Sequence, residues 1–173
     1  MGVTLDAISG QDLAGLVKDN ISTAVDLSGK GVADFMHGVS DMAAGKKISV
    51  LRIWSHGVTH YTDGSQYDKG GNIKLGEEKV GPDTIDKYVS ALATITPLFE
   101  PSARVELRGC QAAYEKGKDM MLKMADIWKV EVQGAERSQP MMAWVPPVYS
   151  AMPGARSLKA ATIIEYNERP SRP

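Results

Sequence analysis

The sequence predicts a single α/β domain, a three-layer sandwich in which helices flank a mostly parallel sheet. Short apolar stretches rich in β-branched residues alternate along the chain with longer segments whose apolar residues recur every three or four positions. Strands that alternate with helices are typical of parallel sheets with helices on both faces. The length of 173 residues fits one compact domain that buries about two-thirds of its unfolded surface.

The first part of the chain, residues 1–45, is predicted to be helical. Within residues 12–44 the apolar positions follow a helical period that is interrupted at the glycines of residues 29–31, which indicates two helices or one broken helix. The following stretch, ISVLRIWS from Ile48 to Ser55, is β-branched and apolar enough for a buried strand. This strand ends at His56.

The middle of the chain is expected to leave the sheet and return through a helix. Residues 58–81 are rich in glycine and polar side chains, and they contain a short strand, NIKLG, in a hairpin or flap. Pro82 opens a helix that Pro97 and the following Glu-Pro pair close. The inner face of this helix is expected to contain Ile85, Val89, Leu92 and Ile95.

The last part of the chain repeats the order of strand, turn and helix. A strand at residues 104–107 ends at Arg108-Gly109-Cys110, and a helix follows whose inner face contains Gly117, Met121, Met124 and Trp128. Two further strands are expected at residues 130–134 and 161–166, separated by a long loop with several prolines. The final residues, 167–173, are expected to form a flexible tail.

Composition excludes several classes of function. Lysine plus arginine (20) nearly balances aspartate plus glutamate (21), and no long run of one charge builds the basic face that nucleic acid requires. No secretory signal and no membrane-spanning run is evident, so we expect a cytoplasmic protein with no membrane partner. Export by a specialised system is compatible with this expectation. The single cysteine cannot form an internal disulfide or a multi-cysteine zinc site, and we expect neither metal nor cofactor.

Two predicted strands end in a reactive residue beside a glycine. One runs into His56-Gly57 and the other into Gly109-Cys110. Because the carboxyl ends of parallel strands share one edge of a sheet, neighbouring strands would place imidazole and thiol close together. A thiolate attacks a carbonyl and a histidine protonates the departing amine, while the N–H groups of Gly57 and Cys110 suit an oxyanion. A helix starting just after Cys110 would favour the thiolate.

These two blocks, IWSHG and VELRGC, resemble the caspase-like cysteine peptidase clan, which includes caspases, metacaspases, gingipains and the bacterial CHAT proteases. The resemblance covers residues 48–136, about half of the chain. This part of the chain is similar to bacterial members of the clan. It implies a caspase-like α/β fold and a thiol protease with a catalytic dyad: His56 as general acid and base, Cys110 as nucleophile and Gly57 as an oxyanion donor. It also implies a strand before the first helix, for which only residues 2–5 are available.

The resemblance further implies a cysteine endopeptidase that acts on a protein or peptide through a thioester acyl-enzyme. It does not specify whether an activating partner or a larger complex is needed. Caspases carry Gln-Ala before the nucleophile, whereas Arg108 and a glycine precede it here. Arg108 either points away from the site or binds substrate. An acidic residue such as Glu136 in the pocket would favour basic substrates. The substrate-binding candidates are Arg108, Glu136, Ser138 and Trp144. Trp144 belongs to the loop segment MMAWVPP, which is either a substrate-binding loop or a cover for the core.

Other interpretations of the same residues remain. Cys110 fits a small buried thiol, and His56 fits a loop histidine that ends a strand. His60 lies four residues after His56, but the residues between them do not favour the helix that a metal pair at this spacing needs. A catalytically inactive caspase-like domain that acts as an interaction or regulatory module is the alternative function. A binding domain for a small ligand is a third interpretation, although the chain shows no convincing phosphate-binding loop.

Overall fold

The computed structural model describes residues 2–56, 61–62, 66–67, 71–137, 139 and 143–161. The elements, in chain order, are β1 Val3–Ser9, α1 Gln11–Asn20, β2 Val25–Asp26, α2 Val32–Ala43, β3 Ile48–Ser55, β4 Tyr61–Thr62, β5 Gln66–Tyr67, β6 Ile73–Leu75, β7 Glu78–Val80, α3 Val89–Ala93, β8 Phe99–Arg108, α4 Gly117–Trp128, β9 Glu131–Ala135, β10 Val148–Ala151 and β11 Lys159–Ala160. Short 3-10 turns at Ile85–Tyr88 and Thr96–Leu98 flank α3.

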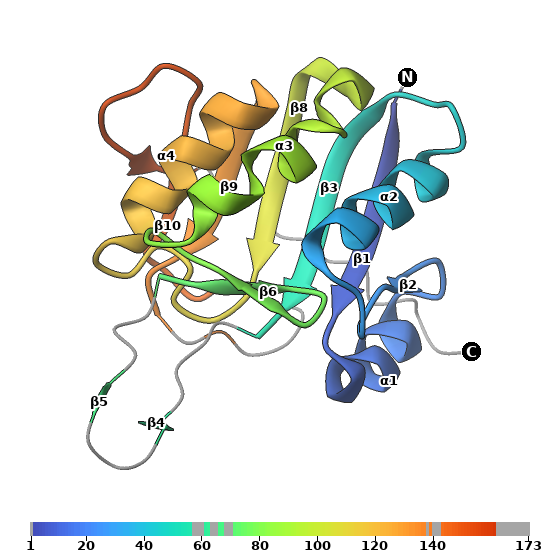
Figure 1. Ribbon diagram of the computed structural model, residues 1–173, viewed down its shortest axis with the longest axis horizontal. Coiled ribbons are helices and arrows are strands. Elements are labelled where there is room, and N and C mark those ends of the chain that lie inside the picture. Colours follow the sequence, from blue (N-terminus) through green and yellow to red (C-terminus); the bar gives the residue numbers. More distant parts are fainter. Residues whose placement is uncertain are drawn as a thin grey trace.

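A seven-stranded, mostly parallel sheet forms the middle layer (Figure 1). The strand order is β11-β10-β9-β8-β3-β1-β2. Neighbours from β2 to β9 are parallel, whereas β10 and β11 are antiparallel. The predicted α/β sandwich with a mostly parallel sheet is therefore confirmed. Two small hairpins, β4-β5 and β6-β7, lie outside this sheet.

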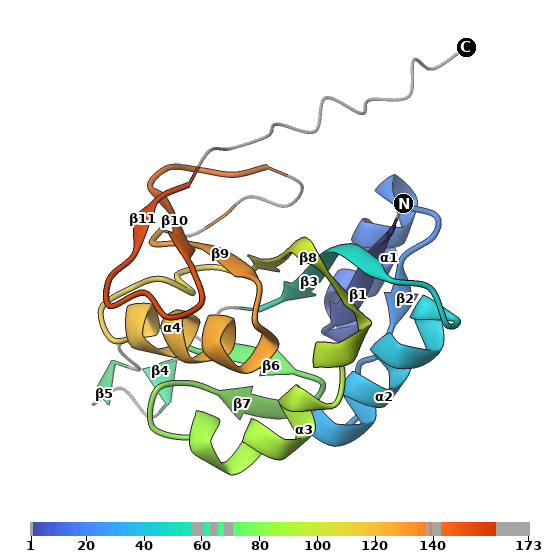
Figure 2. The same cartoon turned by 90° about the horizontal axis from the view of Figure 1, so that it is seen from above.

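Helices lie on both faces of the sheet (Figure 2). α2, α3 and α4 pack on one face, where they form the main hydrophobic core with the inward residues of the central strands. α1 packs on the other face, against Ile8 and Trp54, and its buried residue Val17 belongs to that smaller cluster. The alternation of side chains along each strand explains the separation, because Ala7 and Ile53 enter the main core while Ile8 and Trp54 meet α1.

The predicted strand at Ile48–Ser55 is confirmed in position, and the helix predicted to bury Gly117, Met121, Met124 and Trp128 is present as α4. The broken N-terminal helix is two helices, and NIKLG contributes β6 to a hairpin with β7. The predicted inner face of the third helix is wrong for Val89, which is 39% exposed. A 3-10 turn precedes Val89, and its tighter period rotates that residue away from the core.

The description of residues 1–45 as a helical segment is incomplete, because this segment also contributes β1 and β2. β1 is longer than residues 2–5 and is buried between β3 and β2. Its polar residues Asp6 and Ser9 do not look like those of a central strand, and the folded structure pairs them with Trp54 on β3 and with Gly76 in the β6-β7 hairpin. The structure also adds β10, which the sequence placed in a loop. Residues 162–166, most of the last expected strand, and the tail at 167–173 lie outside the described residues.

Within the described ranges, no helix has both the length and the apolar character needed to cross a membrane.

Candidate functional site

The ends of β3 and β8 meet at one edge of the sheet. The two strands are parallel neighbours, paired without interruption from Val50 opposite Arg104 to Trp54 opposite Arg108. His56 lies two residues after Trp54, and Cys110 lies two residues after Arg108. At the same edge, the strand order reverses beside β3, at β1, because the chain adds β2 on one side of β1 and β3 on the other. Crevices at such reversal points are common ligand sites in open α/β sheets.

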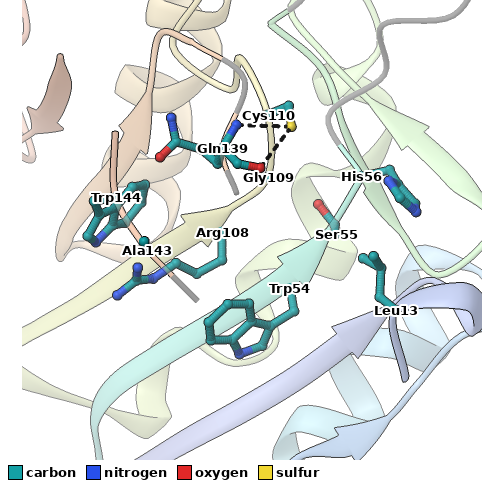
Figure 3. Close-up of a pocket in the computed structure, with 10 residues that line it drawn as sticks. All are labelled: Leu13, Trp54, Ser55, His56, Arg108, Gly109, Cys110, Gln139, Ala143 and Trp144. Carbon is teal, nitrogen blue, oxygen red and sulfur yellow. Dashed lines mark hydrogen bonds between the residues drawn. The ribbon is translucent and has the colours of Figure 1, made fainter. Parts of the chain in front are cut away.

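A cavity of about 160 Å³ lies at this edge, and both His56 and Cys110 line it (Figure 3). Its remaining walls come from the ends of β3 and β8, from α1 and from the segment after β9: Leu13, Trp54, Ser55, Arg108, Gly109, Gln139, Ala143 and Trp144. The structure therefore brings the imidazole and the thiol predicted from the sequence to one cavity, together with two of the substrate-binding candidates, Arg108 and Trp144.

His56 is held by an aspartate that the sequence interpretation missed. Nε2 of His56 lies 2.6 Å from Oδ2 of Asp12, in the first turn of α1. Figure 3 shows the imidazole turned away from the Cys110 sulfur. The hydrogen bond with His56 lowers the pKa of Asp12 below its ordinary value of 3.8. The aspartate therefore remains a carboxylate at neutral pH and holds the ring on the α1 side of the cavity.

Cys110 lies in the turn that follows β8. The backbone N–H of Gln139 donates to its sulfur across 3.2 Å, and the thiol faces the Gln139 carbonyl oxygen at 3.7 Å. The side chain of Gln139 accepts from the N–H of Val145 at 2.6 Å and donates to the carbonyl of Val145 at 3.1 Å. Gln139 therefore joins the thiol to the loop that carries Trp144.

The expectation that a helix begins directly after Cys110 is wrong. The chain first forms a tight turn, in which Gln111 has a φ of 55° and Glu115 a φ of 44°, and α4 begins only at Gly117. The influence of a helix N-terminus is confined to its first turn. The backbone N–H of Gln139 is instead the hydrogen-bond donor that the structure provides to the sulfur.

Arg108 points into the site and is held rigidly. Its guanidinium lies 4.1 Å from the ring centre of Trp144 and 5.5 Å from that of Trp54. Its Nε and Nη2 both bond Oε2 of the buried Glu106, at 2.9 and 2.7 Å. Burial lowers the pKa of Arg108, and the Glu106 carboxylate opposes that effect. The guanidinium is therefore a charged group stacked on Trp144, and Figure 3 shows it extending away from the Cys110 sulfur.

The other predicted site residues are placed differently. Glu136 does not line the cavity, and instead pairs with Lys118 at 3.0 Å and accepts a long hydrogen bond from the Tyr149 hydroxyl. The pocket for basic side chains that Glu136 suggested is therefore not seen at this cavity. Gly57, Ser138, Met141, Met142 and His60 lie outside the described residues.

The sequence held little signal for Asp12 or for Gln139. Asp12 acts through the packing of α1 on the sheet, and its first-turn position alone fits an ordinary acidic residue at a helix start. Gln139 contacts the sulfur through its backbone, which carries no residue signature. The Arg-x-Glu-x-Arg alternation of β8 was the one available clue to Glu106, since alternate strand residues share a face.

Comparison with known proteins gives one family. The family model described as a domain of unknown function (DUF4347) matches residues 9–139, which span both His56 and Cys110. No curated protein and no solved structure matches the chain.

Proposed function

The chain belongs to the DUF4347 family, and we propose that it is a cysteine endopeptidase in which Cys110 is the nucleophile and His56 the general acid and base. The observation that carries the proposal is the parallel pairing of β3 with β8, which brings both residues to one cavity at the carboxyl edge of the sheet. The caspase-like resemblance of the two strand ends supports it. A thiol and an imidazole in one cavity are the groups that acyl transfer to sulfur requires.

The proposed reaction proceeds through a thioester. The Cys110 thiolate adds to the peptide carbonyl carbon, forming the C–S bond while the carbonyl electrons move to oxygen. The imidazolium of His56 donates a proton to the amine nitrogen as the C–N bond breaks. Water, deprotonated by His56, then attacks the thioester carbonyl and releases the acid and the thiol. No cofactor or oxidant enters this sequence.

Backbone donors at the cavity suit the oxyanion that forms in both steps. The N–H of Cys110 makes no hydrogen bond to any other described residue, and Cys110 lies at the cavity. Its N–H is therefore available to a developing negative charge, for which removal of one donor typically costs a factor of about 100 or more. The N–H of Gly57 remains the proposed second donor, by the resemblance alone.

The lining of the cavity favours an acidic or neutral substrate side chain over a basic one. Among the described residues that line it, Arg108 carries a permanent charge and none is a carboxylate. The guanidinium lies near two indole rings, Trp54 and Trp144, so a substrate group that reaches it meets a cationic donor beside apolar surface. We therefore propose Arg108 and Trp144 as substrate-binding residues.

A second candidate function, an inactive domain that serves as an interaction or regulatory module, has its own supporting observation. His56 is bonded to Asp12 and turned from the sulfur, and the sulfur is engaged by Gln139. In the peptidase, these contacts describe a resting arrangement that the imidazole leaves when substrate enters. In the inactive module they describe the only arrangement.

A cleavage screen separates the two functions. The wild-type chain and the variants Cys110→Ala and His56→Ala are incubated with a proteome-derived peptide library, and new termini are identified by mass spectrometry. The peptidase yields termini that share a preferred residue in the wild-type sample and are absent from both variants. If the wild-type chain gives no new termini, or the Cys110→Ala variant gives the same ones, the peptidase proposal fails.

A further inference from the structure

A row of polar residues crosses one face of the sheet. Asp6, Arg52, Glu106, Gln133 and Ser150 are register partners on β1, β3, β8, β9 and β10, and all five are buried. The helices α2, α3 and α4 cover the opposite face, and α1 covers only the β1 and β3 end of this one (Figure 2). Over β8 to β11, no described helix covers the polar face.

A hollow of about 410 Å³ lies on this part of the face, a volume in the range of small-molecule sites. Its floor contains Arg104 and Glu131, opposite each other on β8 and β9, and Ser150 and Lys159, opposite each other on β10 and β11. Trp144 lines this hollow and also the cavity of Cys110. The hollow and the candidate active site therefore share one wall.

The two basic residues of the hollow have donors available for a ligand. Arg104 uses Nε on Glu106, at 2.8 Å, and its terminal amino groups make no hydrogen bond within the described part of the chain. Lys159 is exposed and makes no side-chain hydrogen bond or ion pair with another described residue. Arg104 and Lys159 line the hollow from β8 and β11, three strand spacings apart, so each offers donors to an anionic group from its own side of the hollow.

The acidic residue opposite Arg104 has only neutral partners among the described residues. Glu131 accepts from Nε2 of Gln133 at 3.0 Å and from the Ser150 hydroxyl. A simple anion in the hollow would be repelled by this carboxylate, and a simple cation by the arginine and the lysine. A ligand that carries both charges a short distance apart satisfies all three groups.

We propose that the hollow binds a free α-amino acid with an apolar side chain. Its carboxylate lies between Arg104 and Lys159, and its ammonium group contacts Glu131. Neighbouring strands are about 4.8 Å apart, so residues opposite each other on β8 and β9 reach both ends of one α-amino acid. Trp144 and Met152 provide the apolar surface for the side chain. This site does not depend on the peptidase proposal, because it shares only Trp144 with the cavity of Cys110 and needs no reaction.

Calorimetric titration with three related probes tests the site. L-Leucine carries both charges, L-leucinamide lacks the carboxylate and N-acetyl-L-leucine lacks the ammonium group. We expect saturable binding of L-leucine, and binding at least about tenfold weaker for each analogue, because each loses charged hydrogen bonds. The intrinsic fluorescence of the chain should change on binding, because Trp144 lines the hollow.

Variants locate the binding. Lys159→Ala and Glu131→Gln should each weaken L-leucine binding several-fold, whereas Lys46→Ala, at an exposed lysine outside the hollow, should leave it unchanged. Lys159 is exposed, so its variant keeps the fold and decides the matter by itself. The proposal is overturned if L-leucine, L-methionine and L-phenylalanine all fail to bind at millimolar concentrations, if both analogues bind as well as L-leucine, or if Lys159→Ala binds normally.

Discussion

The carboxylate of Asp12 lies 2.6 Å from Nε2 of His56 and joins the first helix to the end of the third strand. The contact draws the imidazole to the α1 side of the cavity, away from the Cys110 sulfur. Both side chains are substantially exposed, with 43% of His56 and 71% of Asp12 accessible. Solvent therefore screens the pair, and a restraint of this kind is worth at most about 1 kcal/mol.

Removing this restraint should raise activity. In Asp12→Ala the imidazole no longer has the partner that holds it away from the sulfur, so we expect kcat/KM for a cleaved peptide to rise by at most about fivefold. Steady-state kinetics measures the change. Asp19→Ala, an exposed substitution near the end of the same helix, is the control and should leave kcat/KM unchanged. A large loss of activity in Asp12→Ala would instead make Asp12 a group that positions His56 for reaction.

The Asp12 contact also predicts how stability depends on pH. Because its folded-state pKa is lowered below 3.8, the carboxylate adds stability above pH 3.8 and loses it as the pH falls through the lower folded value. A difference in melting temperature between wild type and Asp12→Asn should therefore be present at pH 3.8 and above, and vanish as the pH falls through the lower folded value. Thermal unfolding followed by circular dichroism over this range checks the sign. A difference that already disappears well above pH 3.8 contradicts the assignment.

Glu106 should be the most sensitive charged position in the sheet. This buried carboxylate contacts Arg52, Arg104 and Arg108, at 3.6, 2.8 and 2.7 Å. In Glu106→Gln the guanidinium groups lose their shared counter-charge, and breaking a buried ion pair in this way typically costs about 3–5 kcal/mol. Urea unfolding measures the loss. The matched change at an exposed residue, Glu77→Gln, should stay within about 0.5 kcal/mol of wild type, and equal effects of the two would refute the role of Glu106.

Gln139 should link loop order to catalysis. In Gln139→Ala the two side-chain bonds to Val145 are lost while the backbone N–H to the sulfur remains, so the loop that carries Trp144 loosens. We expect KM to rise and kcat to change little, because substrate binding weakens and the reacting groups stay. Gln139→Pro removes the backbone donor instead and should lower kcat. The same kinetic pattern in both variants would argue against separate roles for the side chain and the backbone.

Much of the fold follows from local pattern. The strand that ends before His56 is where its apolar pattern indicates, and the residues predicted for the inner face of the later helix are buried in α4, although α4 begins later than expected. The meeting of His56 and Cys110 at one edge follows from parallel pairing, because both residues end strands. β1 was underestimated because Asp6 and Ser9 look unlike a central strand until Trp54 and the β6-β7 hairpin supply their partners.

Long-range contacts explain the remaining differences. The partnership of Asp12 with His56 depends on which face of the sheet α1 covers, and no local pattern specifies that face. The contact of Gln139 with Cys110 involves a backbone N–H, and the pairing of β10 with β9 requires the chain to reverse after a proline-rich loop. The sequence suggested Glu136 for a substrate pocket, but in the structure this residue forms an ion pair with Lys118 on α4.

The most direct measurement is capture of an acyl group on Cys110 by a peptide thioester, followed by intact-protein mass spectrometry in wild type and His56→Ala. If the two residues act together, the wild-type chain gains one acyl group at Cys110 and then loses it by hydrolysis, while His56→Ala reacts at least about a hundredfold more slowly. Equal rates in the two proteins, or acylation at residues other than Cys110, would contradict the account.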